Sequence, residues 1–98
     1  MNIRLVPEDF HLHLRARMQQ RGVTEQEIER ALNEGREATD AKSGTFGKVI
    51  ILPYRAEWEG KFYEQKEVTT YYKIKDGRIV PLTVKARYGQ DFEGEEET

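Results

Sequence analysis

Apolar side chains recur at every fourth position near the start of the chain, which is the spacing of a helix with one buried side. Phe10, Leu14 and Met18 form this stripe, and we expect one helix over residues 7–21. Gly22 then suits the left-handed conformation with which many helices end. The pattern predicts a helix whose apolar side packs on the core.

A second helix is predicted directly after the first. Thr24 and Glu27 have the spacing of a capping box, in which each side chain bonds the backbone N–H of the other residue. Gly35 suits the end of this helix. Its inner side carries three apolar residues: Ile28, Ala31 and Leu32. Because so few residues separate the two helices, they must turn sharply against each other.

The rest of the chain has the pattern of short strands. We expect strands at residues 3–6, 36–40, 46–54, 62–75 and 79–88. The segment 36–40 is typical of an edge strand, and the continuous apolar run 49–52 is typical of a strand buried on both faces. A polar turn, 56–61, contains Trp58. These elements predict an α+β fold, in which two N-terminal helices pack on an antiparallel sheet of about four strands.

The last two strands are predicted to form a hairpin, and its turn decides which side chains share a face. A two-residue turn of Asp76 and Gly77 would mix apolar and charged positions, whereas a three-residue turn, 75–77, separates them. We therefore predict the three-residue turn, and Pro81 indicates an edge or a bulge. One face then carries the mostly apolar set Val68, Thr70, Tyr72, Ile74, Val80, Leu82, Val84 and Ala86. The opposite face carries Tyr71, Lys73, Thr83, Lys85 and Arg87.

The charge of the chain is distributed unevenly. Four of its 18 acidic residues lie in the last six positions, so 14 acidic residues face 16 basic ones in the remainder, a net charge of +2. We predict one domain, 1–92, followed by an acidic disordered tail, 93–98. The chain has no cysteine, which excludes disulfides and a cysteine nucleophile. Neither a membrane span nor a secretory signal is visible, so we expect a cytoplasmic protein.

His13, Arg17 and Arg21 recur at spacing four and form a polar stripe at the border of the apolar side. Histidine exchanges protons near neutral pH, and guanidinium groups bind phosphate through paired hydrogen bonds. The stripe therefore suits phosphate chemistry, although an ordinary solvated helix surface would have the same pattern. His11, two residues before His13, would point elsewhere on a helix, and no set of metal ligands is visible. We expect neither a metal nor another cofactor.

The predicted polar face of the hairpin is the second candidate site. Lys73, Lys85 and Arg87 can neutralise a phosphate backbone, and Tyr71 can stack on a base. The alternative is a solvated sheet face without a ligand. The sequence leaves both interpretations open.

Residues 13–24, HLRARMQQRGVT, resemble the opening signature of the domain-of-unknown-function family 4258, His-Ala-x-x-Arg-Met-x-x-Arg-Gly-Ile-Ser. The closing Val-x-Thr-Val pattern of that family is similar to residues 80–84. Leu14 departs from the signature, where the family favours Ala, and the long central hairpin around Trp58 is a second departure. Members of the family look similar to the RelE/barnase-like group of ribonucleases and toxins. The resemblance implies that fold and, by analogy, RNA cleavage.

The resulting expectation is a toxin-like, metal-independent ribonuclease or RNA-binding protein, with RNA and a cognate antitoxin protein as partners. The catalytic candidates are His13, Arg17 and Arg87. The nucleic-acid-binding candidates are Arg21, Tyr71, Lys73 and Lys85. The alternative is a non-catalytic interaction module that binds nucleic acid or an acidic partner protein. Catalysis requires His13 and the basic sheet face to converge on one cleft, so the sequence leaves open whether the protein is an enzyme.

Overall fold

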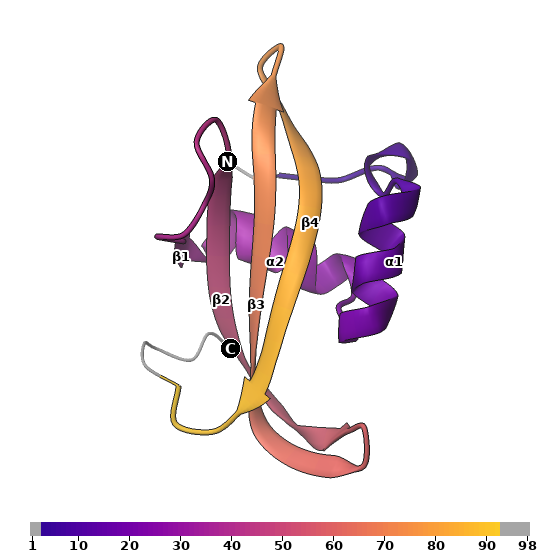
Figure 1. The fold of residues 1–98 in the computed structure, drawn as a ribbon, viewed down its shortest axis with the longest axis vertical. Coiled ribbons are helices and arrows are strands. Elements are labelled where there is room, and N and C mark those ends of the chain that lie inside the picture. Colours follow the sequence, from indigo (N-terminus) through magenta and orange to yellow (C-terminus); the bar gives the residue numbers. More distant parts are fainter. Residues whose placement is uncertain (1–2, 93–98) are drawn as a thin grey trace.

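The computed structural model describes residues 3–92, and the predicted tail, 93–98, lies outside them. The elements in chain order are η1 (Pro7–Asp9), α1 (Leu12–Arg21), α2 (Glu25–Glu34), β1 (Arg36–Glu37), β2 (Phe46–Trp58), β3 (Lys61–Lys75) and β4 (Arg78–Gly89). Neighbouring strands are antiparallel, and the order in the sheet follows the chain, β1-β2-β3-β4. Figure 1 shows α2 behind the sheet and α1 beside β4. The predicted α+β fold is confirmed.

The first helix is shorter than predicted. Residues 7–9 form a separate 3₁₀ turn, in which the Asp9 carboxylate accepts from the Val6 N–H at 2.8 Å. His11 has an extended backbone (φ −68°, ψ 171°), and α1 begins at Leu12. The prediction of one helix over 7–21 is therefore wrong at its start, because the Val6–Asp9 bond closes a turn of its own.

Residues 3–6 do not form the predicted strand, because side chains of α2 bond their backbone. The Ile3 N–H donates to Asn33 Oδ1 at 2.6 Å, and the Leu5 N–H donates to Glu29 Oε2 at 2.8 Å. The side chains of Ile3 and Leu5 pack against the core. Because its backbone bonds side chains of α2, this segment does not pair with a strand of the sheet.

The junction between the helices follows the sequence closely. Gly22 adopts the left-handed conformation (φ 70°) and ends α1. Thr24 Oγ1 accepts from the Glu27 N–H at 3.1 Å, and Glu27 Oε1 accepts from the Thr24 N–H at 2.9 Å. The predicted capping box is confirmed.

We expect Thr24→Ala to lower the free energy of unfolding by about 1 kcal/mol, because the substitution removes the N-cap of α2. Urea unfolding followed by circular dichroism measures this change. Thr39→Ala is a matched control, because Thr39 is exposed in the loop between β1 and β2. Equal stabilities of the two variants would contradict a capping role for Thr24.

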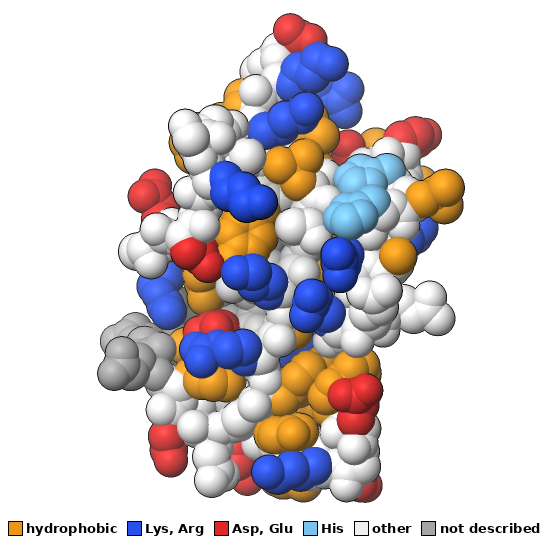
Figure 2. Space-filling view, in the orientation of Figure 1, with side chains coloured by type: hydrophobic (Ala, Val, Ile, Leu, Met, Phe, Trp, Pro, Cys, Tyr) orange, Lys and Arg blue, Asp and Glu red, His pale blue; other side chains and the backbone are white. Residues whose placement is uncertain are grey.

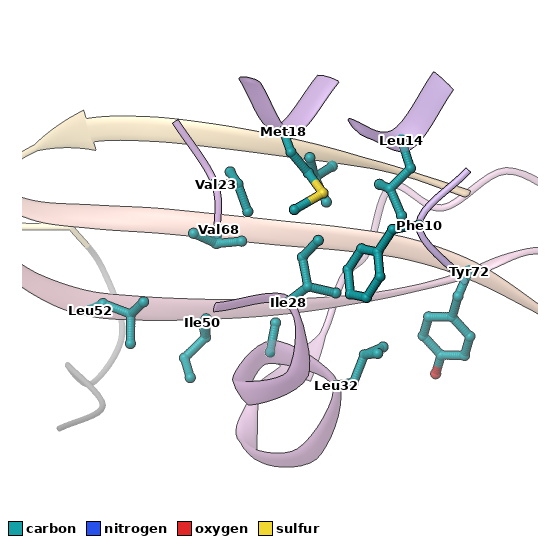
Figure 3. Packing of buried hydrophobic residues seen from close by; sticks show 12 residues of the cluster. Phe10, Leu14, Met18, Val23, Ile28, Leu32, Ile50, Leu52, Val68 and Tyr72 are labelled. Atoms are coloured by element: carbon teal, nitrogen blue, oxygen red, sulfur yellow. The ribbon is translucent and has the colours of Figure 1, made fainter. Parts of the chain in front are cut away.

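One hydrophobic core lies between the helices and the sheet (Figure 3). Leu14 and Met18 of α1, Ile28 of α2 and Val68 of β3 all belong to this core. In β2, Ile50 and Leu52 belong to the core, whereas the adjacent Ile51 points to the opposite face and is also fully buried. The prediction of a β2 segment buried on both faces is confirmed for residues 50–52.

The turn between β3 and β4 corrects our predicted register. Asp76 (φ 51°) and Gly77 (φ 74°) form a two-residue turn, and Lys75 pairs with Arg78. The three-residue turn is therefore wrong. A register shift at Tyr71 and Tyr72 leaves Leu82 as the extra residue of a bulge, as Pro81 had indicated.

The bulge changes which residues of β4 face the core. Beyond it Val84 pairs with Thr70 and Ala86 with Val68, so Val84 is buried in the core as predicted. On the turn side the predicted faces are reversed. Ile79 and Pro81 take the places expected for Val80 and Leu82. Val80 and Leu82 therefore lie outside the core cluster.

Candidate nucleic-acid interface

α1 and β4 run side by side in the same direction (Figure 1). At one end the His11 ring bonds the Pro81 carbonyl oxygen at 3.1 Å. At the other end the Tyr88 hydroxyl donates to the Arg21 carbonyl oxygen at 2.6 Å. The helix α1 therefore follows β4 along its length. We call the surface formed by His13, Arg17, Arg21, Thr83, Lys85 and Arg87 the α1–β4 strip.

Figure 2 shows this side of the molecule, with the two histidines next to a row of Lys and Arg side chains. The β4 members share the face opposite the helices, because Thr83 pairs with Tyr71, Lys85 with Thr69 and Arg87 with Glu67. We call this the front face of the sheet. The shared face that the sequence predicted for Tyr71, Lys85 and Arg87 is confirmed.

His11 has a structural role that the sequence did not reveal. Its Nδ1 accepts from the Leu14 N–H at 3.3 Å, so the residue caps α1, and Nε2 donates to the carbonyl of Pro81. Its ring is stacked on that of His13, with centroids 6.2 Å apart. Because His11 precedes the helix, its expected placement on another helix face is wrong. Histidine is not a typical N-cap residue, so no local signal predicted this role.

His13 is exposed, and within residues 3–92 no group hydrogen-bonds its ring. Arg17 is half-buried and donates to Gln20 Oε1 at 3.3 Å. Arg21 is half-buried at the end of α1, and its Nε atom is buried without a partner in the described part of the chain. The helix stripe thus presents a histidine and two guanidinium groups on one side.

Acidic residues partly neutralise the front face. The Tyr71 hydroxyl lies 2.9 Å from both carboxylate oxygens of Asp40, and Lys85 Nζ lies 3.3 Å from Oδ2. The hydrogen bonds from Tyr71 and Lys85 lower the pKa of Asp40. Tyr71 is 9% exposed, and Lys85 Nζ lies 5.2 Å from the centre of its ring. Tyr71 therefore presents its hydroxyl rather than an open ring face to the surface.

Arg87 lies apart from the histidines, and Lys73 lies beyond the bulge. Arg87 makes two hydrogen bonds to the Glu67 carboxylate, at 2.8 and 3.1 Å. It is six positions beyond Pro81, which is about 20 Å along an extended strand. Lys73 is exposed on the other side of the bulge, toward the turn 76–77. The structure therefore brings Arg17 near His13 but does not bring Arg87 there.

Asp40, Tyr71 and Lys85 form a cluster on the front face. Two hollows lie beside this cluster, and its three residues line both of them. One has a volume of about 270 Å³ and is also lined by Arg87, and the other has a volume of about 350 Å³ and is also lined by Lys42. Asp40 and Lys42 both belong to the loop between β1 and β2. No sequence pattern indicated this arrangement, because Asp40 is 31 positions from Tyr71.

A buried lysine that no sequence pattern indicated, Lys66, stabilises the end of the α1–β4 strip near Gly22. Lys66 Nζ donates to the Gly22 carbonyl and, at 2.7 Å, to Glu27 Oε1. It lies 5.5 Å from the ring centres of Tyr54 and Tyr88. Burial raises the pKa of Tyr88, so its hydroxyl remains a donor. Lys66 thus ties the ends of both helices to β3.

Trp58 also packs at this end rather than in the polar turn that was predicted around it. β2 continues to Trp58, and the indole stacks on the Tyr88 ring with centroids 5.0 Å apart. The ring also lies against Gly22. Trp58 therefore helps to fix the end of α1.

The chain matches no protein family, curated protein or solved structure with which it was compared. Within residues 3–92, no three His, Asp or Glu side chains are grouped so that they could hold a metal ion. No helix in that part of the chain is long and apolar enough to cross a membrane.

Proposed function

We propose that this protein binds single-stranded RNA along the α1–β4 strip and cleaves it without a metal ion. The observation that carries the proposal is the parallel course of α1 and β4, from the His11–Pro81 contact to the Arg21–Tyr88 contact. This course aligns two rows of cations with an exposed histidine. Such a row suits successive phosphates of one strand, because each Lys or Arg can neutralise one of them.

In the proposed reaction, His13 takes the proton of a ribose 2′-hydroxyl while that oxygen attacks the adjacent phosphorus. The bond to the 5′ oxygen breaks, and this oxygen takes a proton from water. Arg17 is one helical turn from His13, a Cβ separation of about 6 Å, and stabilises the charge on the phosphorane. Lys85 and Arg87, which are farther along β4, bind neighbouring phosphates.

The resemblance of residues 13–24 to family 4258 supports the same proposal. A RelE-like toxin acts on RNA in the cytoplasm and is controlled by an antitoxin protein. We therefore propose a cytoplasmic location and a cognate antitoxin as the protein partner.

We expect Arg17→Gln and Lys85→Gln each to weaken binding of a fluorescent single-stranded RNA, measured by anisotropy across a range of salt concentrations. Each variant should lower the slope of log affinity against log salt by about 0.7, because one phosphate contact is lost. Arg30→Gln is the matched control, because Arg30 lies on α2 and pairs with Glu34. Absence of RNA binding by the wild-type protein at low salt would exclude a nucleic-acid function.

A second candidate function is a binding module without catalytic activity. The observation that favours it is the His13 ring, which no group within residues 3–92 orients by a hydrogen bond. A catalytic base is generally oriented by a second group. RNA binding without cleavage, unchanged in His13→Ala, would support this candidate.

A further inference from the structure

Asp40 holds the position on the front face at which a bound anion would meet two donors. Its carboxylate oxygens accept from the Tyr71 hydroxyl at 2.9 Å, and Oδ2 also accepts from Lys85 Nζ at 3.3 Å. We infer that this carboxylate fills an anion subsite that a phosphate of the RNA backbone occupies on binding. The inference rests on the proposed RNA-binding function.

The two donors suit a phosphate as well as they suit a carboxylate. Both anions present oxygens that accept from a hydroxyl and from an ammonium group. Burial raises the pKa of Tyr71, so the phenol keeps its proton and remains a donor at neutral pH. The hydrogen bond to Tyr71 raises the pKa of Lys85, so the amine remains charged. The subsite therefore keeps both donors when Asp40 leaves.

The contact of Asp40 with Lys85 is exchangeable. Both side chains are 58% exposed, and exposed ion pairs contribute little to stability. Asp40 lies in the loop between β1 and β2, outside the sheet ladder, so it can move without breaking strand pairing. The two flanking hollows, about 270 and 350 Å³ in volume, provide space beside the donors. Lys42 lines the second hollow and adds a further cation.

The neighbouring ion pair between Arg87 and Glu67 is less easily exchanged than the contact between Asp40 and Lys85. The Glu67 side chain is 13% exposed, lies on the central strand β3 and holds Arg87 through two hydrogen bonds. Leaving this carboxylate unpaired in a mostly buried position would be costly. Asp40, rather than Glu67, is therefore the carboxylate that a phosphate displaces.

We expect Asp40→Asn to bind single-stranded RNA about two- to fivefold more tightly than the wild-type protein, which is the range of an exposed ion pair. The amide oxygen of the new side chain still accepts a hydrogen bond from the Tyr71 hydroxyl, so the loop stays attached to the sheet. Glu34→Gln is the control, because it changes the net charge equally and also breaks an exposed ion pair, on α2. In a Lys85→Gln background, Asp40→Asn should have no further effect.

Inorganic phosphate tests the subsite without RNA. We expect phosphate to shift the backbone amide NMR signals of Thr83 and Lys85 at lower concentration in Asp40→Asn than in the wild-type or Glu34→Gln proteins. Equal phosphate titrations, or equal RNA affinities of Asp40→Asn and Glu34→Gln, would overturn the inference while RNA binding stands. If no variant binds RNA but phosphate still favours Asp40→Asn, the proposed function fails and the anion subsite remains.

Discussion

We expect His13→Ala to lower the rate of RNA cleavage in the presence of EDTA by at least about 100-fold, because proton transfer by a positioned side chain contributes that much. His13 is exposed at the start of α1 and lies outside the core, so the melting temperature should stay close to that of the wild-type protein. Single-turnover cleavage of a labelled single-stranded RNA measures the rate. Circular dichroism measures the melting temperature.

Leu12→Ala is the matched control for this experiment. Leu12 adjoins His13, is 87% exposed and has no ionisable group, so its removal should leave cleavage unchanged. Equal rates of cleavage by His13→Ala and the wild-type protein would show that His13 does not carry the proton. If the wild-type protein binds RNA but never cleaves it, the non-catalytic module is the correct function.

We expect Gly22→Ala to lower the free energy of unfolding by about 2–5 kcal/mol. A side chain with φ near 70° costs about 1–2 kcal/mol, and overpacking adds about 1–3 kcal/mol. The new Cβ would lie 2.5 Å from a ring carbon of Trp58 and 2.7 Å from the Tyr88 hydroxyl. Relief of these contacts would disturb the hydrogen bond between Tyr88 and Arg21, which fixes the end of the strip.

Gly44→Ala separates the two contributions. Gly44 also has a positive φ, 82°, but no atom lies within 4 Å of the Cβ that the substitution would add. We expect this variant to lose about 1–2 kcal/mol, from the backbone conformation alone. Urea unfolding of both variants measures the difference. Equal losses would mean that Trp58 and Tyr88 do not pack closely on Gly22.

The turn between β3 and β4 shows why a strand pattern was insufficient to predict the register. The strand pattern favours a three-residue turn, because that turn separates apolar from charged positions along the whole hairpin. In the structure, a two-residue turn followed by a bulge at Leu82 gives the same separation of apolar and charged positions beyond residue 82. One extra residue in a strand reverses its faces, so two different turns predict the same face for Val84.

The sequence by itself determined the features that depend on neighbouring residues. The stripe of Leu14 and Met18, the end of α1 at Gly22 and the capping box of α2 arise from contacts within a few positions. The helical period also determined that His13, Arg17 and Arg21 share one side of α1. These features need no knowledge of the sheet.

Only the tertiary structure determined which residues from distant parts of the chain contact one another. Asp40 meets Lys85 across 45 positions, and Lys66 meets Glu27 across 39. It also decided that α1 follows β4, which aligns the helix stripe with the cations of the strand. Such pairings depend on how the elements pack rather than on local periodicity, because residues distant in the chain meet only when the core forms.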